Sequence, residues 1–168
     1  MNTADVLEEE FGRIQEAVHE VVEGLPAGDL GDRLDSGANS IAWLVWHLTR
    51  VQDGHVAEAA GLEQVWLAQG WAGRFGLPFD DTETGYGQSA RQTAQVQAGA
   101  ELLTGYYDAV HEQTVGFVRG LDDAALDRVV DEAWSPPVTL GVRLASVIAD
   151  DLQHAGQAAF VRGALERR

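Results

Sequence analysis

The chain of 168 residues contains no cysteine and no lysine, so all 11 of its basic residues are arginines. The absence of cysteine excludes a disulfide framework, a thiol nucleophile and a cysteine-rich zinc module. The absence of lysine excludes a lysine Schiff base and the phosphate-binding loop that ends in lysine. Any metal ion in this protein must therefore be held by histidine and carboxylate side chains.

Positive charge is also scarce, because 27 acidic residues against 11 basic ones give a formal net charge of -16. This excess repels nucleic-acid phosphates and anionic lipid head groups, and no basic cluster interrupts it. The first ten residues lack the basic and apolar regions of a signal peptide, and no apolar run approaches the length of a membrane span. We expect a cytoplasmic protein that binds neither nucleic acid nor membranes.

Apolar residues recur at intervals of three and four in four segments, which is typical of amphipathic helices. The expected long helices cover residues 5–23, 41–60, 96–119 and 140 to near the C-terminus. Asn39 or Ser40 can cap the second helix, and Thr139 can cap the fourth. The stripes expected to be buried include Val6 on the first helix, and Leu152 and Phe160 on the last.

The connections between these helices carry weaker signals. Short helices are expected over residues 62–69 and 122–130, whereas residues 71–88 are rich in glycine and acidic residues and favour a long irregular loop. No alternating pattern indicates a strand. The sequence therefore predicts an all-α protein, a four-helix bundle with a long loop between the second and third helices, forming one domain over residues 1–168.

Three polar side chains conflict with the apolar stripes around them. His47 lies three residues after Leu44 and four before Val51, so its ring projects from the apolar face. Asp150 and His154 are one helical turn apart and also project near the core. A divalent metal bound by two histidines and one carboxylate would resolve this conflict. The alternative is an Asp–His hydrogen bond across one turn, with His47 bonded to a carbonyl group or water.

The segments that carry these residues resemble a known family. Residues 39–53 (NSIAWLVWHLTRVQD) and 150–157 (DDLQHAGQ) are similar to the second-helix and last-helix signatures of the DinB-like superfamily. The resemblance implies a four-helix bundle that holds zinc or nickel through His47, Asp150 and His154. A carboxylate at Asp150 resembles the mycothiol-dependent maleylpyruvate isomerase branch, and Asp151 is the neighbouring candidate ligand. The resemblance also implies a homodimer.

The same resemblance implies an activity. Characterised members are thiol transferases or isomerases that use a small thiol such as mycothiol, bacillithiol or glutathione. We therefore expect a metal-activated thiolate that attacks an electrophilic substrate. Two alternatives stay open, a metal-dependent hydrolase and a non-catalytic bundle with a ligand-binding or stress-linked role.

Several nearby residues have both a functional and a structural interpretation. Arg50 and Trp43 are candidates for binding the cofactor. An arginine beside acidic residues more commonly forms an exposed salt bridge, and a tryptophan in a bundle more commonly lies in the core. Asp53 lies about 120° around the helix from His47, so we place it behind the ligands or on the helix surface. His19 and His55 are expected to be solvated, and Tyr107 and His111 to form a structural pair.

Overall fold

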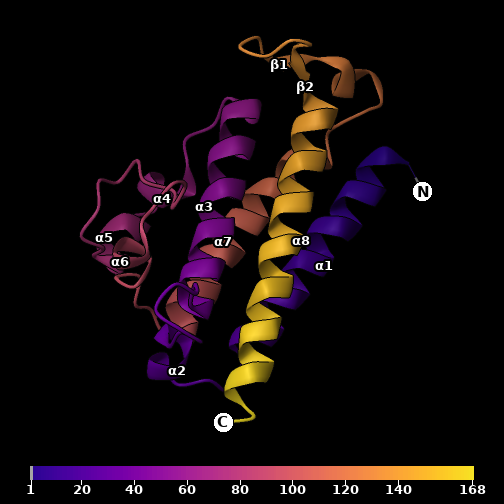
Figure 1. The fold of residues 1–168 in the computed structure, drawn as a ribbon. Helices are drawn as coiled ribbons and strands as arrows, with labels where there is room; N and C mark the ends of the chain where they lie inside the picture. Colours follow the sequence, from indigo (N-terminus) through magenta and orange to yellow (C-terminus); the bar gives the residue numbers. More distant parts are fainter. Residues whose placement is uncertain (1) are drawn as a thin grey trace.

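The computed structural model describes residues 2–168, and four long helices lie side by side in it (Figure 1). They are α1 (Thr3–Val22), α3 (Ile41–Ala60), α7 (Ala100–Val118) and α8 (Leu140–Leu165). Helix α3 packs on α7 and α8, and α1 packs on the other sides of the same two helices. The prediction of an all-α four-helix bundle is confirmed.

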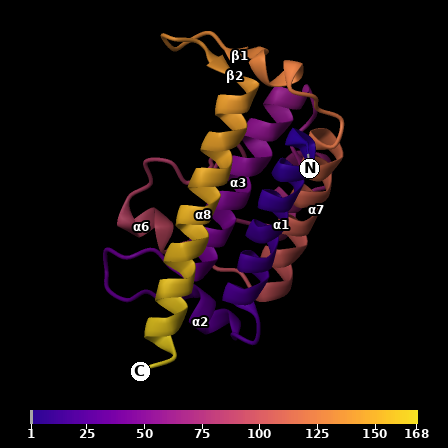
Figure 2. The same cartoon turned by 90° about the vertical axis from the view of Figure 1, so that its right-hand side faces the viewer.

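The direction of the helices explains the long central connection. Helices α3 and α7 run parallel, so the chain from residue 61 to 99 must return along the whole length of the bundle (Figure 2). It does so on the outside of α3 and α7. Three short helices interrupt this return, namely α4 (Val65–Ala68), α5 (Trp71–Phe75) and α6 (Ala90–Thr93).

The helix ends follow from side-chain capping. Ser40 accepts a hydrogen bond from the Trp43 amide at 3.1 Å, and the Thr139 hydroxyl accepts one from the Val142 amide at the start of α8. Gly61 ends α3 with a φ of 68°, a left-handed conformation that favours glycine. Ser40 rather than Asn39 is therefore the N-cap of α3.

The prediction of an irregular loop from residue 71 was wrong for its first turn. Trp71 and Phe75 are four residues apart, so helix α5 places both rings on one face. Both rings pack on Tyr106, at centroid distances of 5.7 and 5.8 Å. The short α2 (Ala27–Gly31) was also missed. Burial against the bundle, which the local sequence does not show, stabilises these short helices.

Two very short strands also occur, although no alternating pattern in the sequence indicated them. Strands β1 (Val129–Asp131) and β2 (Val138–Thr139) pair antiparallel beyond the 3-10 helix η1 (Ala124–Asp127), at the end of the bundle where α8 begins. Strands of three and two residues are too short to show an alternating pattern. The hairpin leads directly into the capped start of α8.

Parts of the expected apolar stripes face solvent. Val6 is 44% exposed, Leu152 41% and Phe160 68%. The rest of the bundle does not surround α1 or α8, because each of these helices packs mainly against two others. The three exposed residues therefore lie on sides that no neighbouring helix covers. None of the helices within residues 2–168 combines the length and apolarity needed to cross a membrane.

A buried polar cluster links α3 to α4 and α7. The Asp53 carboxylate, 1% exposed, accepts hydrogen bonds from the amides of Val65 and Trp66 and from the Tyr106 hydroxyl, each at 2.8 Å. Arg50, equally buried, lies 3.8 Å from the same carboxylate. Burial raises the pKa of Asp53, and these hydrogen bonds and the guanidinium group oppose that rise. The cluster fixes α4 at the end of α3.

We expect the Asp53→Ala variant to be destabilised by about 3–5 kcal/mol, because it leaves buried donors without their acceptor and a buried guanidinium group without its counter-charge. Urea unfolding followed by circular dichroism measures this change. Asp127→Ala, at an exposed position of η1, is the matched control and should change the free energy of unfolding by less than about 0.5 kcal/mol. Equal effects of the two substitutions would contradict the role assigned to Asp53.

Candidate metal centre

The structure brings His47, Asp150 and His154 together between α3 and α8. One ligand atom from each residue can be chosen so that all three lie within 4.8 Å of one another. The two imidazole rings are 4.8 Å apart at their centroids and nearly perpendicular, at 73°. Asp150 and His154 share a face of α8 because they are four residues apart. Packing of α3 on α8 brings His47 to that face.

Hydrogen bonds to Nδ1 orient both histidines. Nδ1 of His47 lies 2.5 Å from the Thr84 carbonyl oxygen, and Nδ1 of His154 lies 2.8 Å from Oε1 of Gln157. Since both partners are acceptors, each Nδ1 carries the proton and each Nε2 keeps a lone pair. Burial lowers the pKa of His47, which favours the neutral, ligating form of its ring.

The carboxylate completes a donor set that fits a divalent ion. Oδ2 of Asp150 is shielded from solvent and has no hydrogen-bond partner among residues 2–168, whereas Oδ1 lies 3.7 Å from Nε2 of His154. That separation is too long for the Asp–His hydrogen bond considered from the sequence. Two imidazole lone pairs and one carboxylate suit Zn²⁺ or Ni²⁺, and three protein ligands leave coordination positions open.

Asp151 does not take part in this cluster. Its side chain is fully buried on the core side of α8, and neither carboxylate oxygen has a hydrogen-bond partner among the described residues. Burial raises the pKa of Asp151 well above its ordinary value, and the neighbouring Asp150 adds to the rise. The register of α8 therefore directs Asp150, and not Asp151, towards the two histidines.

A cavity of about 510 Å³ lies beside two of the three clustered residues. Its walls include His47, Asp150, Arg50, His55, Glu58, Gln64 and the 91% exposed Tyr86. A larger groove of about 630 Å³ lies farther along α8, but none of the three clustered residues lines it. We assign the smaller cavity to the site because a ligand in it can reach the open side of the cluster.

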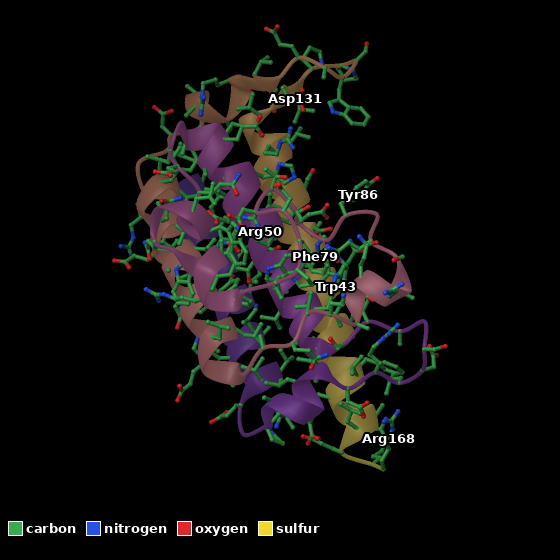
Figure 3. The ribbon with its side chains drawn as sticks, turned by 90° about the vertical axis from the view of Figure 1, so that its left-hand side faces the viewer. Trp43, Arg50, Phe79, Tyr86, Asp131 and Arg168 are labelled. Atoms are coloured by element: carbon green, nitrogen blue, oxygen red, sulfur yellow. The ribbon has the colours of Figure 1, made fainter. Side chains whose placement is uncertain are left out.

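Arg50 is not the exposed salt bridge that its acidic neighbours suggested. It is 1% exposed and donates to Oε1 of Gln64 and to the carbonyl oxygens of Asp81 and Glu83. Its guanidinium group also stacks over Trp66, 4.9 Å from the ring centroid. Arg50 thus lines the cavity while most of its donors hold the surrounding chain. Figure 3 shows Arg50 in the middle of the molecule, away from both ends of the bundle.

The other expected residues are distributed around the cluster. Trp43 is buried, stacks on His47 with a centroid distance of 4.6 Å, and donates its indole N–H to Gln88. His55 is not solvated as expected: it is partly buried, its Nδ1 lies 2.9 Å from Arg143, and burial lowers its pKa. His19 is exposed and contacts Asp108.

Tyr107 and His111 form the expected structural pair, with stacked rings 6.2 Å apart. They lie on α7, and neither residue lines the cavity beside the cluster.

The sequence did not reveal the part played by residues 80–88. This segment supplies the Thr84 carbonyl to His47 and two further carbonyls to Arg50. Backbone groups leave no side-chain signal in a sequence, so only the two glycines of this segment, Gly85 and Gly87, could have suggested a close backbone approach.

Comparison with known proteins agrees with this architecture. The model of the DinB superfamily matches residues 10–158. A solved structure, that of a conserved protein from Enterococcus faecalis, is 27% identical and superposes with a TM-score of 0.92, over all of this chain and 99% of the other. No curated protein matches the sequence. With most of its length matched by the family model, the chain belongs to the DinB superfamily, whose members often bind a divalent metal.

Proposed function

We propose that this protein is a divalent-metal-dependent transferase or isomerase that uses a low-molecular-weight thiol. The observation that carries the proposal is the cluster of two Nε2 lone pairs and one carboxylate beside an open cavity. The chain contains no cysteine, so the reacting sulfur must come from a small-molecule thiol. The carboxylate at Asp150, which resembles the maleylpyruvate isomerase branch, supports mycothiol as the first thiol to test.

His47, Asp150 and His154 would hold the ion. A bound divalent ion would lower the pKa of a thiol and so supply a thiolate near neutral pH. Acceptors at Nδ1 of His47 and His154 would leave Nε2 of each ring free to bind the ion, and burial favours the neutral form of His47. Asp150 contributes one negative charge, which leaves the loaded centre able to attract an anionic sulfur.

The cavity walls would bind and orient the two substrates. Arg50, His55 and Glu58 all line the cavity, so the lining of the cavity contains both basic and acidic groups. Tyr86 lies at the solvent-exposed rim, where its ring can cover part of a bound molecule. We propose that Arg50 contributes to thiol binding from the cavity wall, and that Trp43 contributes indirectly by stacking on His47.

Metal content tests the first half of the proposal. Protein purified without a metal-affinity step should contain about one zinc or nickel ion per chain, and His154→Ala should contain almost none, because two ligands from one protein rarely retain the ion. Elemental analysis measures both.

His19→Ala is the matched control, since His19 lies on α1 outside the cluster, and it should keep the metal of the parent protein. A parent protein that neither contains nor takes up zinc or nickel would overturn the proposal and favour a non-catalytic bundle.

Thiol dependence tests the second half. The metal-loaded protein is assayed with mycothiol, bacillithiol and glutathione against activated alkenes, epoxides and aryl halides. We expect turnover with at least one thiol, and a loss of more than about a hundredfold in His47→Ala, because the thiolate is no longer stabilised.

The wild-type protein without thiol is the control. Turnover that persists there would identify a metal-dependent hydrolase instead, and a loaded protein that is inactive with every thiol and without one would contradict catalysis.

A further inference from the structure

The backbone of residues 81–85 lies directly against the imidazole ring of His47. The Thr84 carbonyl oxygen is 2.5 Å from Nδ1, and a Cβ atom placed on Gly85 would lie 2.8 Å from the same nitrogen. That Cβ would also lie 3.1 Å from the rings of Trp43 and Trp46. Real Cβ atoms essentially never lie as close as 2.8 Å to another atom, and the φ of Gly85 is 97°. Only glycine allows the chain to lie against the histidine here.

Arg50, one turn after His47 on α3, holds the same segment. Its Nε and Nη2 donate to the carbonyl oxygens of Glu83 and Asp81, each at 3.2 Å. The carbonyls of residues 81, 83 and 84 are therefore all bonded to side chains of α3. Two of these bonds involve a guanidinium group that is itself held near Asp53, at 3.8 Å. The segment is attached to α3 at two carbonyls immediately before its contact with His47.

We propose that residues 81–85 are a positioning strap for His47, and that Gly85 and Arg50 are its positioning residues. The strap, defined as these five residues, keeps the proton of His47 on Nδ1 and so directs the Nε2 lone pair towards Asp150 and His154. This inference rests on the proposed metal centre. Acceptors that orient a ligating histidine typically change metal affinity by about 10- to 100-fold.

A glycine that only relieves backbone strain would differ from one that also positions His47, and Gly87 provides the comparison. Gly87, two residues farther on, also has a positive φ of 73°, but a Cβ atom there would meet nothing within 4 Å. Alanine strains the backbone at either position, but it displaces the Thr84 carbonyl only at Gly85. The two glycines therefore separate positioning of His47 from general strain in the connection.

The experiment compares zinc binding by the full-length wild-type protein, Gly85→Ala and Gly87→Ala, by competition with a chromophoric chelator. We expect the Kd for zinc to rise about 10- to 100-fold in Gly85→Ala and less than about threefold in Gly87→Ala. Thermal unfolding of the metal-free proteins reports the strain common to both variants. Equal zinc affinity in all three proteins would overturn the strap and leave the metal centre intact, whereas a wild type without zinc affinity would overturn the proposed function.

The tautomer of His47 provides a readout that does not depend on any strap variant. Long-range nitrogen–proton NMR spectra of the metal-free wild type, with His47→Ala used to assign the signal, should show the proton on Nδ1. A proton on Nε2 would overturn the proposal, even if Gly85→Ala failed to fold.

Arg50→Lys tests the second positioning residue while it keeps the charge beside Asp53. One ammonium group cannot reproduce the forked contacts to two carbonyls, so we expect a smaller rise in the zinc Kd, of about three- to tenfold. Unchanged affinity would show that Arg50 does not act through the strap.

Discussion

The buried pair of Arg50 and Asp53 on α3 is the interaction on which most of the connection and the site depend. Two charged groups in a protein interior are costly unless other hydrogen bonds satisfy them. Asp53 meets that requirement with the amides of Val65 and Trp66 and the Tyr106 hydroxyl, and Arg50 meets it with Gln64 and two backbone carbonyls. One turn of α3 thereby organises α4, α7 and the segment that reaches His47.

The pair of Arg50 and Asp53 is important because of the path that the chain takes between α3 and α7. Because α3 and α7 are parallel, residues 61–99 must travel the length of the bundle, and part of that return passes over the face where α3 meets α8. A long return without attachments would leave the cluster open to solvent. Here Arg50 and His47 bind backbone carbonyls of this connection, so the connection forms a defined wall of the cavity beside the cluster.

Helix α8 shows how strongly chemistry depends on one residue of register. Asp150 and Asp151 are neighbours, but successive residues on a helix differ by about 100° in direction. Asp150 faces His47 and His154 at the edge of the bundle, whereas Asp151 is fully buried with a raised pKa and no hydrogen-bond partner among the residues described. The same residue type is thus a candidate ligand at one position and a buried core group with a raised pKa at the next.

The sequence by itself determined the four long helices, the cap at Thr139, and the candidates His47, Asp150 and His154, because periodicity and capping are local properties of a helix. Only the structure chose Ser40 over Asn39 as the cap of α3. Local patterns could not determine the burial of Arg50, the helix at Trp71–Phe75 or the exposure of Phe160, since each depends on which neighbour covers that surface. Only the tertiary structure placed the Thr84 carbonyl on His47. A backbone group has the same chemistry at every position, so its role is decided by where the fold brings it.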